Sequence, residues 1–218
     1  MKKYVDMLSG ISLFRGAKSH EILPLLTVLA ARDQSYDKGE ILLRMGDRTT
    51  CFGIVLEGAV QIVKEDIGGN TVLLAQLESG ALFAESFVCA GLPIAVTVQA
   101  VKNSVVFWVD YENLRQPPAP YYAVCGRIAE NLAEIFARKT IFLTGRIEHL
   151  SKRTLREKVL SYLSEQAVYA GSRRFAIPLN RQELADYLAV DRSALSAALG
   201  RLRDEGVIDF RKNQFTLL

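Results

Sequence analysis

The chain has 218 residues, of which 50% are hydrophobic and 23% charged, a composition typical of a soluble globular protein. It has two histidines, His20 and His149, too few for a site with several histidine ligands, and we expect neither a metal nor a cofactor. Its three cysteines lie far apart in the sequence, which argues against a disulfide framework. No apolar stretch approaches the ~20 residues of a membrane helix, so we expect a cytoplasmic protein with no membrane partner.

Basic residues are concentrated in the last third of the chain. The formal net charge is +3; residues 1–150 have 15 basic and 16 acidic side chains, whereas residues 151–218 have 12 basic and 8 acidic ones. The balance is therefore −1 before Ser151 and +4 from Ser151 onward. Such asymmetry suits a C-terminal domain that binds nucleic acid, although a solvated basic surface explains it equally well.

The first two thirds of the chain predict a helix followed by short strands. The helix is expected over residues 20–31, where apolar side chains have helical spacing. From about Ser35 to Asp110, alternating apolar stretches separated by glycine-bearing turns predict a sandwich, roll or barrel. A hairpin turn is expected at residues 66–70, where glycine reaches positive φ without steric cost. The expected strands are residues 40–44, 52–57, 59–64, 71–76, 95–100 and 104–110.

A long helix is expected after the sheet, from Tyr121 to about Leu150, because the prolines of residues 116–120 end the strand pattern. Its residues form two apolar stripes. The first stripe, which we call the seam, consists of Tyr121, Cys125, Ile128, Leu132, Ile135, Lys139 and Phe142. The second stripe consists of Val124, Phe136, Leu143, Ile147 and Leu150. Two apolar sides predict a homodimer that meets at the seam; the alternative is that both stripes pack within one chain.

The end of the chain predicts a winged helix-turn-helix. Asn180 and Asp191 are placed to cap two short helices, and Ala185 is small where these helices must cross closely. Residues 206–210 and 214–217 alternate around a polar turn, which predicts the two strands of a wing.

The outer side of the second short helix is small and polar at its start, which suits insertion into the major groove of double-stranded DNA. The residues expected on this side are Arg192, Ser193, Ser196, Ala197, Gly200 and Arg203. Arg192 is long enough to donate two hydrogen bonds to a guanine edge. Phosphate contacts are expected from Arg174, Arg181, Arg201 and Lys212. The alternative is a common helix pair whose arginines are merely solvated.

Several stretches make the chain similar to the cyclic-AMP receptor protein/FNR (Crp/Fnr) superfamily over nearly its whole length. The stretches are YDKGE at 36–40, MGD at 45–47, GIVLEG at 53–58, LFAE at 82–85 and NRQELADYL at 180–188. The resemblance implies an α+β protein with a cyclic-nucleotide-binding-like β-roll of the jelly-roll type, a long dimerisation helix and a C-terminal winged helix-turn-helix. These parts are expected at residues 1–118, 119–150 and 151–218, the same order that the residue patterns predict.

The resemblance also implies a transcription regulator that binds a near-palindromic operator as a homodimer. An effector in the roll is expected to change how the two recognition helices are set, and RNA polymerase is an expected partner. Ser193 and Ala197 replace the Glu and Arg with which the best-known members contact their operators, so the operator sequence is expected to differ.

A departure from the family pattern argues against cyclic AMP as the effector. Nucleotide-binding members have Phe-Gly-Glu and then an Arg-Ser or Arg-Thr pair, whereas this chain has Phe83-Ala84-Glu85 and then Ile94-Ala95. A buried phosphate without its guanidinium is strongly unfavourable, so we expect an unidentified small-molecule effector. The expected pocket residues are Leu82, Phe83, Glu85, Ser86, Ile94, Ala95, Val96, Lys139 and Thr140. The alternative is that these side chains fill the core.

Three other functions compete with this one. A non-DNA-binding interaction module does not easily account for the capped helix pair and the wing. A regulator that responds to cyclic nucleotides is the nearest alternative. A cupin-like β-barrel enzyme would need clustered histidine and carboxylate ligands on its strands, but His20 and His149 lie outside the strand region. The FNR-type N-terminal cysteine cluster is absent, so no iron–sulfur centre is expected either. The expectation is a DNA-binding regulator without enzymatic activity.

Overall fold

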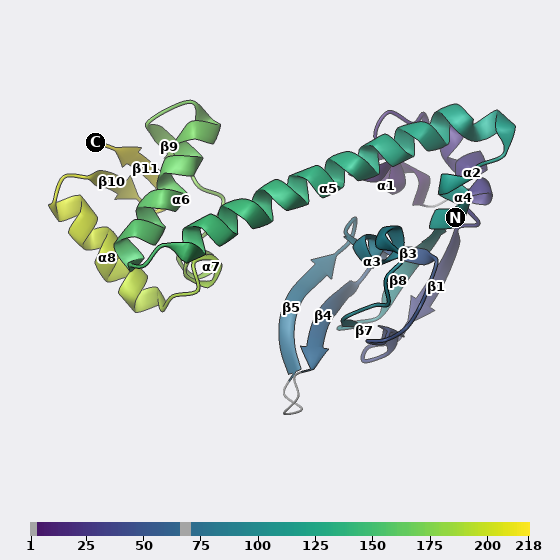
Figure 1. Cartoon of the computed structure of the whole chain (residues 1–218), viewed down its shortest axis with the longest axis horizontal. Coiled ribbons are helices and arrows are strands. Elements are labelled where there is room, and N and C mark those ends of the chain that lie inside the picture. The colour runs from purple at the N-terminus through teal and green to yellow at the C-terminus, as the bar shows by residue number, and fades with distance from the viewer. Residues whose placement is uncertain (1–3, 66–70) are drawn as a thin grey trace. The chain divides into compact units, whose positions relative to one another are not determined.

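The computed structural model describes residues 4–65 and 71–218, and contacts divide the chain into two compact units. The boundary lies between Phe136 and Ala137, inside a long helix. Each unit has its own buried core, and Figure 1 labels the elements of both. The three-part division expected from the sequence stays a prediction, and the hairpin turn expected at 66–70 lies outside the described residues.

The first unit contains a β-roll built from two antiparallel sheets (Figure 1). Among the described residues one sheet has the strand order β1-β8-β3-β6 and the other β2-β7-β4-β5. The strands are β1 (Arg32–Tyr36), β2 (Ile41–Leu43), β3 (Cys51–Glu57), β4 (Ala59–Glu65), β5 (Thr71–Glu78), β6 (Leu82–Phe83), β7 (Thr97–Ala100) and β8 (Ser104–Asp110). Every expected strand overlaps an observed one, and the expected β-roll is confirmed.

Strand β1 was not predicted, because Arg32, Asp33, Gln34 and Ser35 are polar and exposed and give no apolar alternation. The strand forms through its pairing with β8, from Arg32 opposite Trp108 onward. The helices of this unit that precede the long one are α1 (Val5–Ser9), α2 (Ser19–Val28), α3 (Glu85–Ala90) and α4 (Tyr111–Arg115), with 3-10 turns at Ser12–Phe14 and Ala119–Tyr121.

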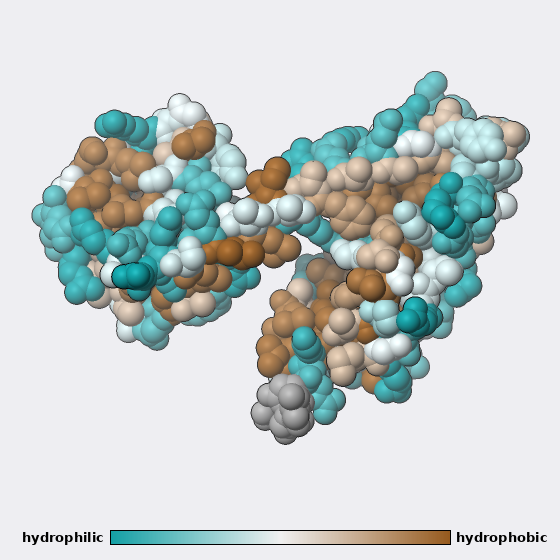
Figure 2. Space-filling model, in the orientation of Figure 1, coloured by the Kyte–Doolittle hydropathy of each residue, from teal (hydrophilic) through white to brown (hydrophobic). Residues whose placement is uncertain are grey.

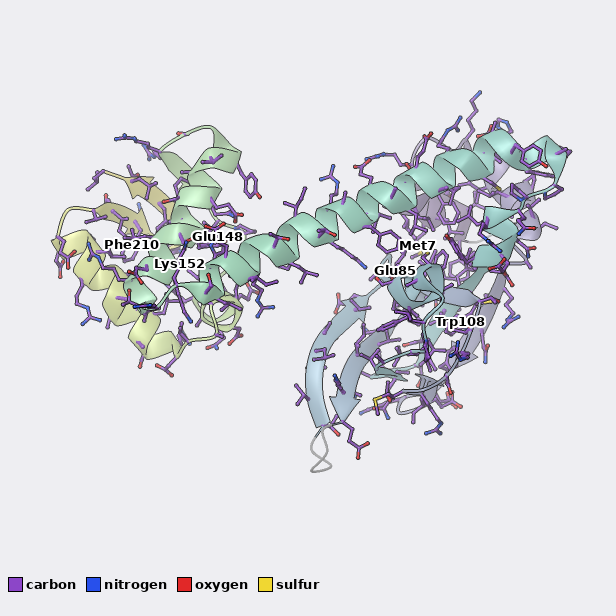
Figure 3. All side chains as sticks on the ribbon, in the orientation of Figure 1. Met7, Glu85, Trp108, Glu148, Lys152 and Phe210 are labelled. Atoms are coloured by element: carbon purple, nitrogen blue, oxygen red, sulfur yellow. The ribbon has the colours of Figure 1, made fainter. Side chains whose placement is uncertain are left out.

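The packing of the roll depends on a close contact between Phe83 and Gly53. A Cβ atom at Gly53 would lie 2.1 Å from Cζ of Phe83, so only glycine leaves room for that ring. The ring also packs edge-to-face on Trp108, with centroids 5.4 Å apart, and the indole Nε1 of Trp108 donates a hydrogen bond of 3.0 Å to Oη of Tyr36. Figure 3 labels Trp108 within this unit. Phe83 is therefore a core residue of the roll.

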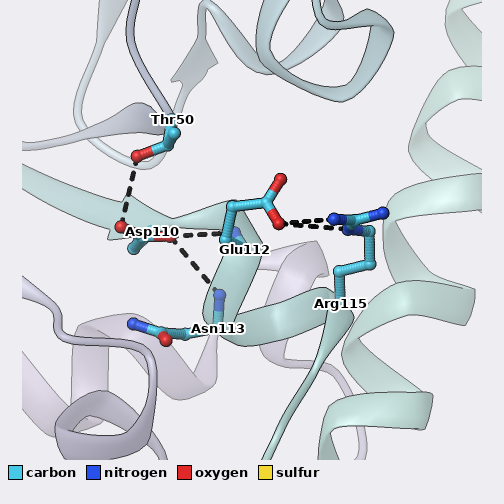
Figure 4. Close-up of polar contacts among 5 residues, drawn as sticks. All are labelled: Thr50, Asp110, Glu112, Asn113 and Arg115. Carbon is cyan, nitrogen blue, oxygen red and sulfur yellow. Dashed lines mark hydrogen bonds and ion pairs between the residues drawn. The ribbon is translucent and has the colours of Figure 1, made fainter.

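Helix α4 begins at a carboxylate cap at the end of β8 (Figure 4). Oδ1 of Asp110 accepts hydrogen bonds from the backbone N–H groups of Glu112 at 2.8 Å and Asn113 at 3.4 Å, while Thr50 donates to Oδ2 at 3.2 Å. Glu112 forms an ion pair with Arg115 one turn later. These contacts satisfy the first backbone donors of the helix and turn the chain away from the sheet.

The second unit contains the C-terminal half of α5 (Tyr122–Ser151) and a small domain of helices and strands. Its elements are α6 (Leu155–Ala170), β9 (Arg174–Ala176), α7 (Arg181–Tyr187), α8 (Arg192–Asp204), β10 (Ile208–Arg211) and β11 (Gln214–Leu217). The strands form an antiparallel sheet in the order β10-β11-β9. One shared core buries five leucines: Leu184 of α7, Leu188 just after α7, and Leu195, Leu199 and Leu202 of α8. The winged helix-turn-helix expected from the sequence is confirmed.

Candidate nucleic-acid interface and sensor region

Both helices of the helix-turn-helix begin at the caps that the sequence predicts. Oδ1 of Asn180 accepts from the N–H groups of Gln182 at 2.9 Å and Glu183 at 3.0 Å, and the Glu183 carboxylate accepts from the N–H of Asn180 at 2.7 Å. Asp191 caps α8 in the same way, at 2.7 Å from the N–H of Ser193 and 3.0 Å from that of Ala194. The hydrogen bond from the Ser193 hydroxyl, together with those from the N–H groups of Ala194 and Ser193, holds the pKa of the Asp191 carboxyl below its usual range. The start of α8 is therefore fixed locally.

The outer side of α8 is exposed, as the spacing of its leucines predicts. The exposed residues include Arg192, Ser193, Ser196, Ala197 and Arg203, and Ala185 is fully buried where α7 meets α8. The Ser196 hydroxyl donates to the carbonyl of Arg192 at 2.9 Å, and the Ser193 hydroxyl donates to Asp191. Each hydroxyl therefore faces solvent mainly as a hydrogen-bond acceptor, which leaves Arg192 as the principal donor at the start of this helix.

Arg181 lies against the wing. Its guanidinium lies 4.9 Å from the ring centroid of Phe210 and 5.3 Å from that of Phe215, and Nη2 donates to the carbonyl of Lys212 at 3.2 Å. Burial lowers the pKa of Arg181. Arg203 also lies over the ring of Phe210, with its guanidinium 5.2 Å from the ring centroid. Arg181 thus joins α7 to the wing in this structure, a role beyond the phosphate contact expected from the sequence.

The rings on which these arginines lie, Phe210 and Phe215, are site residues that were not predicted from the sequence. They are directly opposite each other in the β10–β11 pairing, and their centroids are 5.6 Å apart. The available signal was the alternation of apolar residues in the two wing strands. The other residues expected at phosphates, Arg174, Arg201 and Lys212, are exposed, and Lys212 occupies the wing turn with φ +55. The second unit therefore presents several cations around α8.

Seven of the nine residues expected at an effector pocket belong to the first unit, and Phe83, Ile94 and Val96 pack in one cluster there, whereas Leu82 packs against another. Phe83 and Ile94 are 1% exposed and pack in one buried cluster with Val55 and Trp108, while Leu82 and Val96 are half-buried, and Ser86 and Ala95 are exposed. Glu85 is 2% exposed and accepts from the Ser86 hydroxyl at 3.3 Å. Figure 3 labels Glu85 beside α3. Lys139 and Thr140 belong to the second unit and are exposed.

The backbone explains the glycine of the family's Phe-Gly-Glu motif. Ala84 precedes α3 with φ +64, the left-handed region that favours glycine, and its side chain is nearly buried. Edge strand β5 has an exposed apolar surface that was not predicted from the sequence, with Val72, Leu73 and Leu74 at least half exposed (Figure 2).

The structure places much of the expected dimer seam inside the core of its own chain. Cys125, Ile128 and Leu132 are at most 4% exposed, and Tyr121 and Ile135 pack against the same core. Burial also raises the pKa of the Cys125 thiol, which disfavours its reactive thiolate. Burial of Cys125, Ile128 and Leu132 favours packing of these side chains within one chain. The dimer contact of the seam stays a prediction.

The last seam residue, Phe142, is 56% exposed, and its ring lies 5.7 Å from the ring of Tyr187 within the second unit. Leu143 and Ile147 of the second stripe are 55% and 67% exposed.

No group of three or more potential metal-ligating side chains occurs in residues 4–65 and 71–218. Within the same ranges no helix combines the length and apolar character needed to cross a membrane.

Two family models match the chain, in the order in which the two folds occur. Residues 33–117 match the cyclic nucleotide-binding domain, and residues 157–218 match the Crp-like helix-turn-helix domain. The first match covers the β-roll, and the second covers most of α6 and the winged helix-turn-helix.

The chain is also similar to individual regulators over most of its length. The chain is 28% identical to the cyclic AMP receptor protein of Thermus thermophilus, over 92% of this chain and 89% of that one. It is 22% identical to the transcriptional activator protein FnrA of Stutzerimonas stutzeri, over 97% of this chain and 86% of that one. The crystal structure of DNR from Pseudomonas aeruginosa has a similar fold, with a TM-score of 0.51, 23% identity, and coverage of 100% of this chain and 95% of that one.

The same family is therefore indicated by the sequence motifs, the order of the folds, the matched family models and the relatives that match nearly the whole chain. The chain belongs to the Crp/Fnr superfamily of transcription regulators and has a helix-turn-helix DNA-binding domain.

Proposed function

We propose that the protein is a cytoplasmic, homodimeric, sequence-specific DNA-binding regulator, and that its two α8 helices bind a near-palindromic operator. The observation that carries the proposal is the exposed outer side of α8, which begins at the Asp191 cap and presents Arg192. Dimers of helix-turn-helix proteins place two such helices one turn of the duplex apart. A small-molecule effector bound in the roll would shift the setting of these helices, and RNA polymerase would be the partner at promoters.

Selection of operator sequences from random duplexes with the purified protein tests this proposal. We expect an enriched site with two related half-sites about 10 base pairs apart. Affinity for it should fall with salt, by a slope of about −0.9 for each phosphate contact on a plot of log K against log salt. Selection is run with and without cell extract, which supplies an effector. Failure to enrich any sequence under both conditions contradicts the proposal.

For the dimer contact we propose Leu143 and Ile147, the exposed residues of the second stripe of α5, rather than the largely buried seam. An α-helix turns about 100° per residue, so Leu143 and Ile147 lie about 40° apart on one face. Both side chains are more than half exposed. Exposed apolar side chains at helical spacing favour pairing with a second apolar helix, most simply the same helix of another copy.

Replacing both Leu143 and Ile147 with glutamate is therefore expected to convert the dimer to a monomer, because the carboxylates would have to be buried without partners. Sedimentation velocity of the full chain measures this change. Val168→Glu is the matched control, since Val168 is 77% exposed on α6 and outside the stripe. A double variant that remains dimeric, or a wild-type chain that is monomeric at every concentration, would refute the proposed contact.

We further propose that the effector is not cyclic AMP. Ile94 and Ala95 stand where nucleotide-binding members of the family have an arginine and a hydroxyl residue, and Ile94 is 1% exposed in an apolar cluster. A cyclic phosphate brought there would lose water without gaining a guanidinium. Calorimetric titration with cyclic AMP and with cyclic GMP is expected to show no saturable heat. Saturable binding of either nucleotide supports the alternative, a regulator that responds to cyclic nucleotides.

A further inference from the structure

The second unit contains a cavity of about 470 Å³ that lies apart from the exposed side of α8. It is lined by α5, α6, the residues Pro178 and Leu179, and the last residue of α7, Tyr187. Volumes of 300–1,000 Å³ are typical of small-molecule sites. Every lining residue belongs to this one unit, so the cavity does not depend on how the two units are placed.

Aromatic rings form much of the cavity wall. Phe142 and Tyr162 both pack on Tyr187, with centroids 5.7 Å and 5.2 Å apart, and Tyr169 lines the cavity from the last turn of α6. Phe142 and Tyr169 are 56% and 64% exposed, so parts of their rings remain open to an occupant. Faces of aromatic rings carry partial negative charge and attract cations.

A carboxylate completes this wall. Oε2 of Glu165 lies 3.1 Å from Nε2 of His149, which is buried, and the Tyr169 hydroxyl donates to Oε1 at 3.3 Å. Nδ1 of His149 in turn lies 2.9 Å from the Ser161 hydroxyl, so the carboxylate is held by groups that are themselves fixed. Each carboxylate oxygen can accept a second hydrogen bond or face a cation.

The negative charge of Glu165 raises the pKa of three nearby tyrosine hydroxyls. The pKa values of Tyr162, Tyr169 and Tyr187 are all raised, by burial for Tyr162 and Tyr187 and mainly by Glu165 for Tyr169; Glu165 contributes in all three cases. The Arg146 guanidinium opposes this effect only at Tyr187, where it also stacks 5.4 Å from the ring centroid. Arg138, the cation among the lining residues, already has an interaction of its own. The Glu165 carboxylate therefore contributes negative charge at each of the three tyrosines of the wall.

We propose that this cavity binds a small organic cation, a quaternary ammonium or protonated amine, between the aromatic rings and the Glu165 carboxylate. A second copy of the chain does not fit this site as well, because the stripe proposed for the dimer lies on the opposite side of α5. Counting about 100° per residue, Leu143 and Ile147 point roughly 170° away from the direction of Arg138, Ile141 and Phe142. A bound cation would contact Tyr187 at the end of α7, the first helix of the helix-turn-helix.

Titration of the full chain with benzyltrimethylammonium, followed by ligand-observed NMR and by calorimetry, tests the inference. We expect saturable binding of one molecule per chain. Choline is then compared with 3,3-dimethylbutan-1-ol, in which carbon replaces the charged nitrogen, and choline is expected to bind more tightly. The measurement needs no DNA and no effector of the roll, so its result is independent of the proposed function.

Glu165→Gln keeps the shape of the side chain and removes its charge, and is expected to weaken benzyltrimethylammonium binding about 5- to 30-fold. Glu148→Gln is the matched control, since Glu148 lies outside the cavity wall and pairs with Lys152, both labelled in Figure 3. Phe142→Ala, at an exposed ring, provides a second variant that is expected to fold and to bind weakly. The inference is overturned by the absence of saturable binding, by equal binding of choline and its neutral analogue, or by unchanged binding in both Glu165→Gln and Phe142→Ala.

Discussion

Arg192→Ala is expected to weaken operator binding by about 1–3 kcal/mol and to remove discrimination at one base pair of each half-site. Arg192 is exposed at the first position of α8, where its side chain points away from the buried leucines. The neighbouring Ser193 and Ser196 hydroxyls already donate within the protein, so they cannot replace the lost donor at a guanine edge. Binding of the wild-type and variant proteins to every single-base substitution of the selected operator measures both effects.

Lys212→Ala is the matched control for this comparison. Lys212 lies in the wing turn, and a cation that contacts phosphate contributes equally to all sequences. This control should weaken binding uniformly and reduce the magnitude of the salt slope by about 1. If Arg192→Ala instead lowered affinity equally for every operator substitution, Arg192 would be a phosphate contact and its proposed role would be wrong.

Gly58→Ala is expected to destabilise the first unit by about 2–5 kcal/mol. Gly58 has φ +88, a backbone conformation that costs other residues about 1–2 kcal/mol. In addition, a Cβ atom there would lie 2.2 Å from Oγ of Ser104 and 2.5 Å from the carbonyl oxygen of Asn103. Relieving that overlap would disturb the 3.0 Å hydrogen bond that the N–H of Ala59 donates to Oγ of Ser104, and overpacking of this kind adds about 1–3 kcal/mol.

Denaturant unfolding followed by tryptophan fluorescence measures this cost directly, because the chain has one tryptophan, Trp108, and it is buried in the first unit. Gly80→Ala is the matched control: Gly80 has φ +89, but a Cβ atom there meets nothing within 4 Å. The control should therefore show only the conformational cost. Equal destabilisation by the two variants would mean that the close contacts of Gly58 contribute nothing.

The long helix shows where sequence periodicity stops being informative. Helical spacing predicts which apolar residues of α5 share a face, but it does not predict which surface covers that face. In the fold, Cys125, Ile128 and Leu132 meet the core of the first unit, whereas Leu143 and Ile147 remain exposed. Helical periodicity encodes which side chains share a face, and only the packing of distant segments decides what that face contacts.

The effector region and the cavity illustrate the same limit. Phe83 and Ile94 pack in a buried cluster with residues from both sheets of the roll, and periodicity does not encode whether such side chains outline a pocket or fill the core. The cavity of the second unit combines Phe142, Glu165 and Tyr187 from three separate helices, and no motif in the sequence brings these residues together. Sites of this kind are visible only in three dimensions.

The sequence by itself determined the order of the two folds, the strands of the roll apart from β1 and β6, both helix caps and the exposed residues of α8. These features depend on local chemistry: alternation, helical spacing, and side chains such as Asn180 and Asp191 that satisfy nearby backbone donors. The tertiary structure alone decided the pairing of the polar strand β1, the burial of the seam, the stacking of Arg181 on the wing and the aromatic cavity. The physical reason is that each of these depends on contacts between segments far apart in the chain, which no local pattern encodes.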